Sequence, residues 1–430
     1  MSLAPSKSQP VIHALNEFLA FLSSQYPQIN TLVLALSGGK DSVCLLHALS
    51  QRLSAENSAN YRLKAVYIDH GLQQDSAQWG EFNKNLCQQF EVEFEQLKVS
   101  VNRQEASLEQ AARKARYQAL AAYIGQASCL LTGQHLDDQA ETLLLQLFRG
   151  AGSKGFAAMP YVKSFAQGLQ ARPLLSVMRK DIEAYIQQQG LSYIDDPSNS
   201  DNTIRRNFIR NKAMPLLRTL WPELSVSLAT AASNQAEAQN LLEQIAAQDL
   251  LTCQQQEALA LSPLLSLSVE RQNNLLRYWF DQYRIKMPSR AVFEQVRQQF
   301  LILKNDTDPK LDFGQWQLRR HQQALYLVDK ASLVFDSKFT DEWQLENDYL
   351  PLAAYPLKAQ SILEKWPELA GKTLKLSFRQ GGEKFYRPDL AHGKSLKNYF
   401  QEQQIPRWKR DSALLVSYQD KVIFIQEKIL

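Results

Sequence analysis

Hydrophobic positions in the first half of the chain follow two alternating patterns. Short continuous apolar runs are typical of strands buried on both faces of a parallel sheet, and they alternate with stretches in which apolar residues recur at helical spacing. The predicted strands cover 32–36, 63–68, 92–99 and 129–133, and the predicted helices 43–53, 107–124, 137–148 and 180–189. This alternation predicts an α/β fold with a doubly wound parallel sheet, whose ligand binds beyond the carboxyl ends of the strands.

The pattern changes after residue 200. A basic helix is expected over 203–218 and a long Ala- and Gln-rich helix over 223–255, followed by amphipathic helices at 269–283 and 291–300 and strands at 315–319 and 324–328. A length of 430 residues fits about three domains. We predict a catalytic α/β domain over 1–220, a mainly helical middle domain with a long linking helix over 221–330, an acid-leaning link over 329–351, and a small α+β domain over 352–430.

Composition narrows the class of protein. Hydrophobic residues make up 45% of the chain and charged residues 21%, as in ordinary globular proteins. No apolar stretch approaches the roughly 18 residues of a membrane span, and the polar N-terminus does not resemble a signal peptide. The four cysteines are widely spaced, which argues against a zinc knuckle, an iron–sulfur cluster or a disulfide framework. We therefore expect a cytoplasmic protein without membrane contact.

The turn after the first predicted strand carries the strongest chemical signal. It reads Ser37, Gly38, Gly39, Lys40, Asp41, Ser42. Two residues without a Cβ let backbone N–H groups approach an anion closely, and we expect Asp41 or Ser42 to cap a helix whose positive end faces the same point. Neither the Walker A spacing nor GxGxxG is present. The turn thus predicts a phosphate cradle, the alternative being an ordinary strand-to-helix turn with a polar cap.

Two further clusters follow predicted strands, and we expect them to share a crevice with this turn. One holds Asp69 and His70, which could touch nucleotide or substrate. The other holds Asp137, Asp138 and Glu141 at a helix start, where acids also serve as caps. Three carboxylates beside a triphosphate need a cation between them. We therefore predict that these acids bind Mg²⁺ and a cationic substrate.

Basic residues suggest a polyanionic partner. Arg113 and Arg116 could clamp phosphate, the alternative for Arg113 being a surface pair with Glu109 at i−4. The 203–218 stretch contains no acid, and 372–430 carries twelve Lys or Arg against six Asp or Glu, interleaved with aromatics. A solvated face is the alternative, but the balance favours RNA. The predicted RNA-binding residues are Arg205, Arg206, Arg210, Lys212, Lys394, Lys397, Arg407, Lys409 and Arg410.

These motifs resemble known families. SGGKDS at 37–42 resembles the PP-loop of ATP pyrophosphatases, which cleave ATP between the α and β phosphates. Further motifs follow it along the chain: DHGL from Asp69, EQAARKARY from Glu109, GQHLDDQAET from Gly133, RGAGSKG from Arg149, RPLL from Arg172, DDPSN from Asp195, RRNFIR from Arg205 and the C-terminal FRQGGEKF and SLKNYFQEQQIPRWKRDSALLV. With these motifs, the chain is similar to bacterial tRNA(Ile)-lysidine synthases in their three-domain form. One departure is Gln134, where we expect a second histidine. No motif matches 225–351.

The resemblance implies an activity. Members of that family use ATP and Mg²⁺ to join free L-lysine to C2 of the wobble cytidine of tRNA(Ile) with a CAU anticodon, through an adenylylated cytidine. It implies a nucleotide site at Ser37 to Ser42 with Asp69 and His70, catalytic roles for Asp41, Arg113, Asp137, Asp138 and Glu141, and metal ligation by Asp41 and Asp138. A homodimer is left open.

Three alternatives stay open from the residues. A PP-loop tRNA thiolase would attack the same kind of base with sulfur, but generally needs paired cysteines. A non-catalytic RNA-binding protein would have little use for the intact loop and acids. An amide-forming ligase on a small substrate would have little use for the basic C-terminal module.

Overall fold

The computed structural model describes residues 9–55, 61–71, 76–100, 108–302, 309–346, 350, 352, 355, 357–388 and 392–426. It divides into two compact units, Met1–Leu241 and Leu242–Leu430, which are described separately. Leu72 of the DHGL motif and the side chain of Glu109 lie outside the described residues. Within the described part of the chain, no helix is both long enough and apolar enough to cross a membrane.

Unit 1 is built on a six-stranded sheet in the order β3-β2-β1-β4-β6-β5. Its strands are β1 (Thr31–Ala35), β2 (Arg62–Asp69), β3 (Glu93–Lys98), β4 (Ser128–Leu131), β5 (Val162–Phe165) and β6 (Gly168–Ala171). Five of them run parallel, and β5 pairs antiparallel with β6 at one edge. The predicted α/β sheet is confirmed, and the strand order reverses between β1 and β4, the kind of position where such sheets bind ligands.

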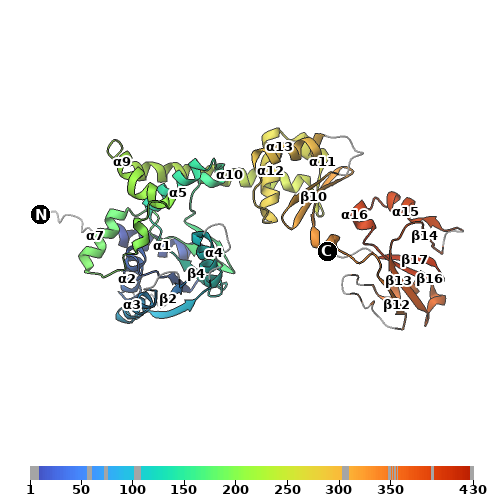
Figure 1. Cartoon of the computed structure of the whole chain (residues 1–430), viewed down its shortest axis with the longest axis horizontal. Coiled ribbons are helices and arrows are strands. Elements are labelled where there is room, and N and C mark those ends of the chain that lie inside the picture. Colours follow the sequence, from blue (N-terminus) through green and yellow to red (C-terminus); the bar gives the residue numbers. More distant parts are fainter. Residues whose placement is uncertain are drawn as a thin grey trace. The chain divides into compact units, whose positions relative to one another are not determined.

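Helices cover both faces of this sheet, so the fold is doubly wound (Figure 1). One face packs against a core that includes α1 (Gln9–Gln25), α2 (Lys40–Ala55), α3 (Ser76–Gln89) and α7 (Arg179–Gln189). The other face, with Val33, Val66 and Leu130, packs against α4 (Leu108–Ala121). Because the central strands are apolar on both faces, the side chains at their carboxyl ends are left to form a site.

The start of α2 corrects one prediction. The helix begins at Lys40, not at Val43, and neither Asp41 nor Ser42 is its cap. The Gly39 carbonyl accepts from the backbone N–H groups of both Ser42 and Val43 at 3.0 Å, so the helical hydrogen bonds start immediately after the glycines. Asp41 therefore lies in the first turn, where a carboxylate is favoured by the helix dipole.

Two helices follow β4. Helix α5 (Leu136–Phe148) begins with a capping box in which His135 accepts from the Asp138 N–H and Asp138 accepts from the His135 N–H. Helix α6 (Ser153–Phe156) is a single turn. The prediction that a carboxylate of this cluster serves as a cap is thus confirmed for Asp138, with His135 as its unexpected partner.

The basic stretch after residue 203 is an interrupted helix. It consists of α8 (Arg205–Phe208), a π-helix η2 (Ile209–Ala213) and α9 (Met214–Arg218). Ile209 and Met214 pack against Ala140 and Leu144 of α5, so this segment lies on the acidic helix. The predicted long helix is α10 (Leu224–Cys253), which is the point of division between the two units.

The first part of unit 2 combines helices with a five-stranded antiparallel sheet of order β7-β8-β11-β10-β9. The predicted hairpin is β10 (Trp316–His321) and β11 (Ala324–Asp329), and the prediction missed the short strands β7 (Gln254–Gln255), β8 (Ala258–Ala260) and β9 (Lys310–Phe313). Helices α11 (Leu261–Ser266), α12 (Val269–Gln282) and α13 (Arg290–Val296), with the π-helix η3 (Arg297–Ile302), share its core around Trp279 and Phe280.

The second part is a mixed six-stranded sheet of order β12-β13-β16-β17-β14-β15. Its strands are β12 (Thr340–Gln344), β13 (Thr373–Phe378), β14 (Lys384–Phe385), β15 (Lys394–Ser395), β16 (Leu414–Tyr418) and β17 (Lys421–Gln426), with helices α14 (Ala359–Leu363), α15 (Leu396–Glu402) and α16 (Arg407–Arg410). The prediction of a plain link over 329–351 is wrong for β12, because Trp343 is buried in the core beside β13. Only Trp343 of its five residues is buried, so this strand has no alternating apolar pattern in the sequence.

Candidate active site

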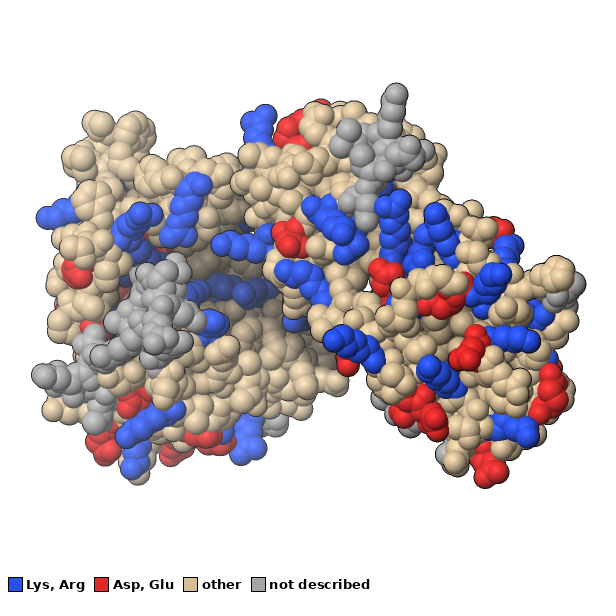
Figure 2. Space-filling view, turned by 45° about the vertical axis from the view of Figure 1, so that its right-hand side comes forward, with Lys and Arg blue, Asp and Glu red and all other residues tan. Residues whose placement is uncertain are grey.

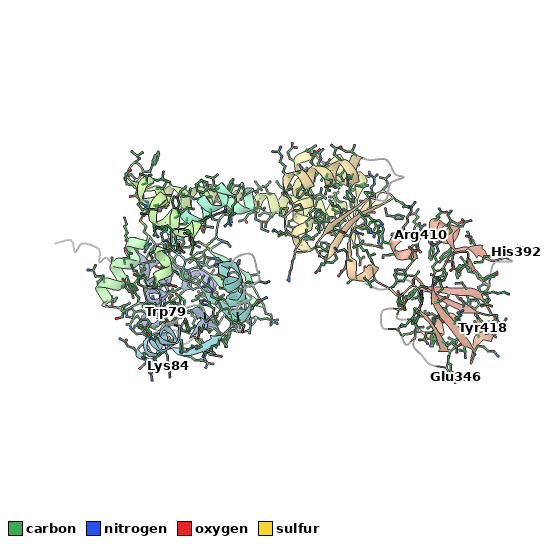
Figure 3. All side chains as sticks on the ribbon, in the orientation of Figure 1. Trp79, Lys84, Glu346, His392, Arg410 and Tyr418 are labelled. Carbon is green, nitrogen blue, oxygen red and sulfur yellow. The ribbon has the colours of Figure 1, made fainter. Side chains whose placement is uncertain are left out.

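A cavity of about 460 Å³ opens at the carboxyl ends of β1 and β2 in unit 1. Its wall combines the glycine turn after β1 with His70 after β2 and Trp79 on α3, which Figure 3 labels. Further lining comes from Arg116 of α4, Arg179, the segment Tyr193 to Asp196, Asn199, Arg210 and Asn211. Polar and cationic side chains thus surround a space large enough for a small ligand.

The glycine turn is held in a fixed conformation. Gly38 has φ +81°, a backbone region that glycine adopts at little cost. The Ser42 hydroxyl accepts from the Ser37 N–H at 3.3 Å and donates to the Gly39 carbonyl at 2.9 Å, while the Ser37 hydroxyl accepts from the Gly39 N–H. The Ile194 N–H donates to the Gly38 carbonyl at 2.9 Å. The first backbone N–H groups of α2 are left without helical partners, as an anion site requires.

A side chain at Gly38 would be strained and would force its neighbours to move. A Cβ at this position would lie 2.4 Å from Ile194 Cδ1 and 2.9 Å from Asn83 Oδ1. The predicted need for glycine at Gly38 is therefore doubly determined, by its φ and by close approach of the 193–196 segment.

Lys40, next to the glycine turn, pairs with an acid of α7. Its ammonium is 2.8 Å from Glu183 Oε1 and lies 5.1 Å from the ring centroid of Tyr193. Burial raises the pKa of Glu183, but the hydrogen bond and charge of Lys40 and the charge of Arg179 outweigh it, and the pKa is lowered. Glu183 is thus held ionised as the partner of Lys40.

Asp41 connects the cavity to the acidic cluster. His135 Nε2 is 3.7 Å from Asp41 Oδ2 and 3.6 Å from Asp138 Oδ2, so the imidazole lies between the two carboxylates. Desolvation raises the pKa of Asp41 above its ordinary value, the nearby His135 opposes this, and the charge of Asp138 adds to it. A carboxylate in this condition is stabilised by an added cation.

The other acids are buried and paired with arginines from the basic stretch. Asp138 and Glu141 are only 6% and 2% exposed. Arg210 donates to Asp138 Oδ1 at 2.6 Å and to both carboxylate oxygens of Glu141 at 2.7 and 2.9 Å. Arg206 donates to the same two acids at 2.9 and 3.0 Å. Four charges thus form one closed network, of the kind that burial of carboxylates requires.

The charges in this network shift the pKa of Asp138. Burial raises it, but His135, Arg206 and Arg210 together outweigh the burial, and the pKa lies below its ordinary value. Arg206 and Arg210, which the sequence assigned to RNA, therefore neutralise acids in this structure, whereas Arg205 and Lys212 are exposed.

Asp137 points to a different set of partners. Its Oδ2 accepts from the Arg179 N–H at 2.8 Å, and its Oδ1 accepts from the Ser225 hydroxyl at 2.8 Å and from Arg218. Burial raises the pKa of Asp137, but these donors outweigh it, so the pKa is lowered. Asp137, Asp138 and Glu141 therefore lie next to the cavity rather than on its wall, joined to it through His135, Arg179 and Arg210.

The remaining predicted residues divide into two groups. Asp69 is buried and accepts from the Gly71 N–H at 2.9 Å, so it shapes the turn that brings His70 to the cavity. Burial and Arg116 lower the pKa of His70. Arg113 is exposed on α4 and lies over the ring of Tyr117, not on the cavity wall.

The predicted RNA-binding residues of unit 2 lie around α15 and α16. Lys397 and Arg407 are exposed, Lys394 pairs with Glu402, Lys409 is half-buried, and Arg410 donates to the Ile405 carbonyl. The space-filling view shows both signs of charge interspersed over this C-terminal part (Figure 2).

Sequence reasoning missed several residues of the cavity wall. Arg179, the segment from Tyr193 to Asp196 and Asn199 line it, although no prediction assigned them a role. The available signal was the DDPSN turn at Asp195, whose Asp196 caps a short 3₁₀ helix, Pro197–Ser200.

Comparison with known families finds a match in each of the three predicted domains. Residues 10–217 match the PP-loop domain, residues 259–326 the TilS substrate binding domain and residues 374–428 the TilS substrate C-terminal domain. A tRNA(Ile)-lysidine synthase from Coxiella burnetii is 34% identical over 417 residues, covering 96% of this chain and 91% of the relative. The chain belongs to the tRNA(Ile)-lysidine synthase family.

Other relatives agree with this membership. The tRNA(Ile)-lysidine synthase of Legionella pneumophila strain Paris is 36% identical over 402 residues, with 92% of this chain and 90% of the relative covered. Among solved structures, the U34-tRNA thiolase NcsA from Methanococcus maripaludis is similar at 16% identity and TM-score 0.42, over 54% of this chain and 78% of that one. Membership in the lysidine synthase family confirms the predicted ligase class, the use of ATP by the PP-loop domain and tRNA as the macromolecular partner.

Proposed function

We propose that this enzyme joins free L-lysine to C2 of the wobble cytidine of tRNA(Ile) with a CAU anticodon, through an adenylylated cytidine, releasing AMP and pyrophosphate. The observation that carries the proposal is the adjacency of two oppositely charged sites. The anion cradle at Ser37 to Ser42 and the cluster of Asp137, Asp138 and Glu141 are joined by His135, which lies between Asp41 and Asp138.

The first step makes the base reactive. A cytosine C2 carbonyl is a poor electrophile, so its oxygen attacks the α-phosphorus of ATP and pyrophosphate leaves. The backbone N–H groups at the start of α2 are placed to take up the charge of that pyrophosphate, with Lys40 beside them. The fixed turn holds these donors in advance, so little reorganisation is needed as charge develops.

The second step needs a neutral amine. The lysine ε-amine attacks C2, a C–N bond forms, the C2–O bond breaks and AMP leaves with the oxygen. The α-ammonium of lysine requires an anionic partner, which the acids on α5 supply. Because Arg206, Arg210 and Arg218 neutralise these acids in this structure, we propose that one of the pairs opens when lysine binds.

Residues that fit Mg²⁺ are present between the two sites. Asp41 and Asp138 supply carboxylate oxygens, the ligands that Mg²⁺ prefers. Burial raises the pKa of Asp41 more than His135, Arg210 and Arg179 lower it, so an added cation would stabilise this carboxylate. The ion would neutralise the phosphates of bound ATP, and these two acids would hold it there.

The thiolase alternative is not favoured by the cysteines. Cys44, Cys87, Cys129 and Cys253 are all buried, and each is a free thiol. Burial raises the pKa of Cys87 and Cys129 to about 12 and also raises that of Cys44, which suppresses the thiolate needed for sulfur transfer. Lysine is therefore the better-supported nucleophile.

The test is incorporation of radiolabelled lysine into an unmodified tRNA(Ile) transcript with a CAU anticodon, with ATP and Mg²⁺ present. We expect label in this RNA with stoichiometric AMP and pyrophosphate, and none in the elongator methionine tRNA, which shares the anticodon. ATP cleavage without label would reject lysine as the nucleophile.

The proposed lysine site has a variant test of its own. Asp137→Asn and Glu141→Gln keep the size of the side chains but remove their charge, so we expect each to raise the KM for lysine at least tenfold. Full activity with unchanged KM values in both variants would contradict the assignment of these acids.

A further inference from the structure

Four cations gather around Tyr117, on the face of the sheet that α4 covers. Arg113 and Arg116 of α4 place their guanidinium carbons 4.9 and 5.8 Å from the centroid of the Tyr117 ring. Arg172 follows β6, Lys163 lies on β5, and both interact electrostatically with Tyr117 and with Arg113. The cluster thus joins α4 to the β5–β6 edge.

This cluster has no acidic partner among the described residues. Neither a hydrogen bond nor an ion pair links any of the four cations to a carboxylate in that part of the chain. Partial burial lowers the pKa of Lys163, and the positive charge of Arg172 lowers it further. Cations that are partly buried beside one another, without a paired acid, are stabilised when an anion binds.

Buried polar atoms in the same place also lack partners. Gln170 is fully buried; its amide NH₂ donates to the Tyr117 hydroxyl at 3.2 Å, but its Oε1 accepts no hydrogen bond from any described residue. Arg172 is 3% exposed, and its Nε–H has no acceptor within the described part of the chain, although Nη1 donates to the Pro160 carbonyl at 2.6 Å. A protein usually satisfies such groups. The Arg172 Nε–H is a donor, so an anion oxygen is one group that would satisfy it, whereas the Gln170 oxygen needs a donor and does not itself point to an anion.

We propose that Arg113, Arg116, Lys163 and Arg172 form a second anion site, separate from the glycine turn, that binds a backbone phosphate of the RNA next to the nucleotide to be modified. The proposal rests on the proposed function. Arg113 and Lys163 are exposed, so a phosphate of a chain passing outside the cavity can reach them.

The position of Arg116 connects this site to the reaction. Arg116 lines the cavity together with His70, whereas the other three cations do not. A phosphate held by the cluster would therefore lie beside the cavity wall, and the attached nucleoside could enter the cavity toward the glycine turn. ATP phosphates are a poor occupant of this cluster, because the proposed cradle at Ser37 to Ser42 would take up that end of the nucleotide.

The test compares two lysines of unit 1 in the full-length protein. Lys163→Ala removes a cation of the site, and Lys84→Ala removes an exposed lysine of α3 as the matched control (Figure 3). The measurement is binding of the tRNA(Ile) transcript at several salt concentrations. We expect Lys163→Ala to weaken binding about tenfold at low salt and to reduce the slope of log K against log salt by about one. We expect Lys84→Ala to bind the transcript as the wild type does, and neither variant to change the KM for ATP.

A second measurement locates the phosphate. Single methylphosphonate linkages are placed in turn along the anticodon loop of the transcript. At the phosphate that Lys163 contacts, wild type and Lys163→Ala should bind the neutralised RNA equally, because the shared interaction is already lost. Equal effects of Lys163→Ala and Lys84→Ala, or a Lys163→Ala effect that persists at every position, would overturn the proposal.

The two proposals can fail separately. Loss of binding in Lys163→Ala without lysine incorporation by wild type would support the phosphate site and reject the proposed reaction. Lysine incorporation with normal RNA binding by Lys163→Ala would reject the site and leave the reaction standing.

Discussion

Arg210 illustrates how a charge changes meaning between sequence and structure. In the sequence it belongs to a stretch with several cations and no acid, which favours RNA. In the structure its guanidinium donates to both oxygens of Glu141 and to Asp138, about 70 residues earlier in the chain. Because the partners come from a distant helix, local charge counting cannot see them.

The network predicts the effect of a conservative change. Arg210→Lys keeps the positive charge but loses the planar fork that binds two carboxylate oxygens at once. We expect the opening free energy of α5 to fall by about 1–3 kcal/mol, since two buried acids lose part of their pairing. Hydrogen exchange of α5 peptides in the full-length protein measures this.

The neighbouring Arg205 supplies the control for this measurement. Arg205→Lys changes an exposed arginine of the same segment, so α5 should exchange as in the wild type. If both variants exchange α5 equally, the carboxylate–arginine network does not stabilise this helix.

At the scale of elements, the glycine turn and α2 act as one piece. The left-handed Gly38 turns the chain, and helical hydrogen bonding starts at the next carbonyl, so the positive end of α2 faces the cavity. The 193–196 segment packs against the same glycine from the other side. The turn is therefore fixed by tertiary contact as well as by its own sequence.

Two glycines with positive φ distinguish the effect of backbone strain from the effect of a steric clash. Gly38→Ala combines backbone strain of about 1 kcal/mol with a steric clash against Ile194. Gly190, the C-cap of α7, has φ +60° and open space around it. Gly190→Ala therefore introduces the strain alone.

We expect Gly38→Ala to raise the KM for ATP more than tenfold and Gly190→Ala to leave it within twofold, measured by pyrophosphate release. A KM for ATP that is unchanged in Gly38→Ala would mean that the turn does not hold the nucleotide.

At the scale of the molecule, one tryptophan joins the two parts of unit 2. Trp408 of α16 is 8% exposed, and its ring centroid lies 5.2 Å from the Arg319 guanidinium carbon and 5.3 Å from the Tyr326 ring. The Gln404 carbonyl also lies 3.0 Å from His321 Nε2. The residues around Trp408 that we predict to bind RNA, Arg407 and Lys409, are thus fixed relative to β10 and β11.

This contact predicts a kinetic signature. We expect Trp408→Ala to raise the KM for tRNA about tenfold with kcat and the KM for ATP nearly unchanged, because uniform binding energy is lost and the chemistry lies in unit 1. Trp408→Phe preserves most of the packing, so its KM for tRNA should lie between those of the wild type and Trp408→Ala. Leu251→Ala, at an 85% exposed position of α10, should resemble the wild type. A fall in kcat alone in Trp408→Ala would contradict a role in tRNA binding.

Local sequence patterns account for most of the regular elements. Apolar runs and helical spacing are local, so the parallel sheet, the hairpin of unit 2 and α10 follow from them. The glycine turn was also readable, because its residue types are required by backbone geometry and by the approach of an anion. By contrast, β7, β8 and β9 are short, and β12 buries only Trp343, so these strands carry no clear local pattern.

Only the tertiary structure decided which charges meet. It placed Arg206, Arg210 and Arg218 on the acids of residues 137–141, set His135 between Asp41 and Asp138, and brought Tyr193 to Asn199 over the cavity. It also gathered Arg113, Arg116, Lys163 and Arg172 around one tyrosine, with no acid paired to them among the described side chains. Electrostatic energy depends on distance and burial, and neither exists until the chain is folded.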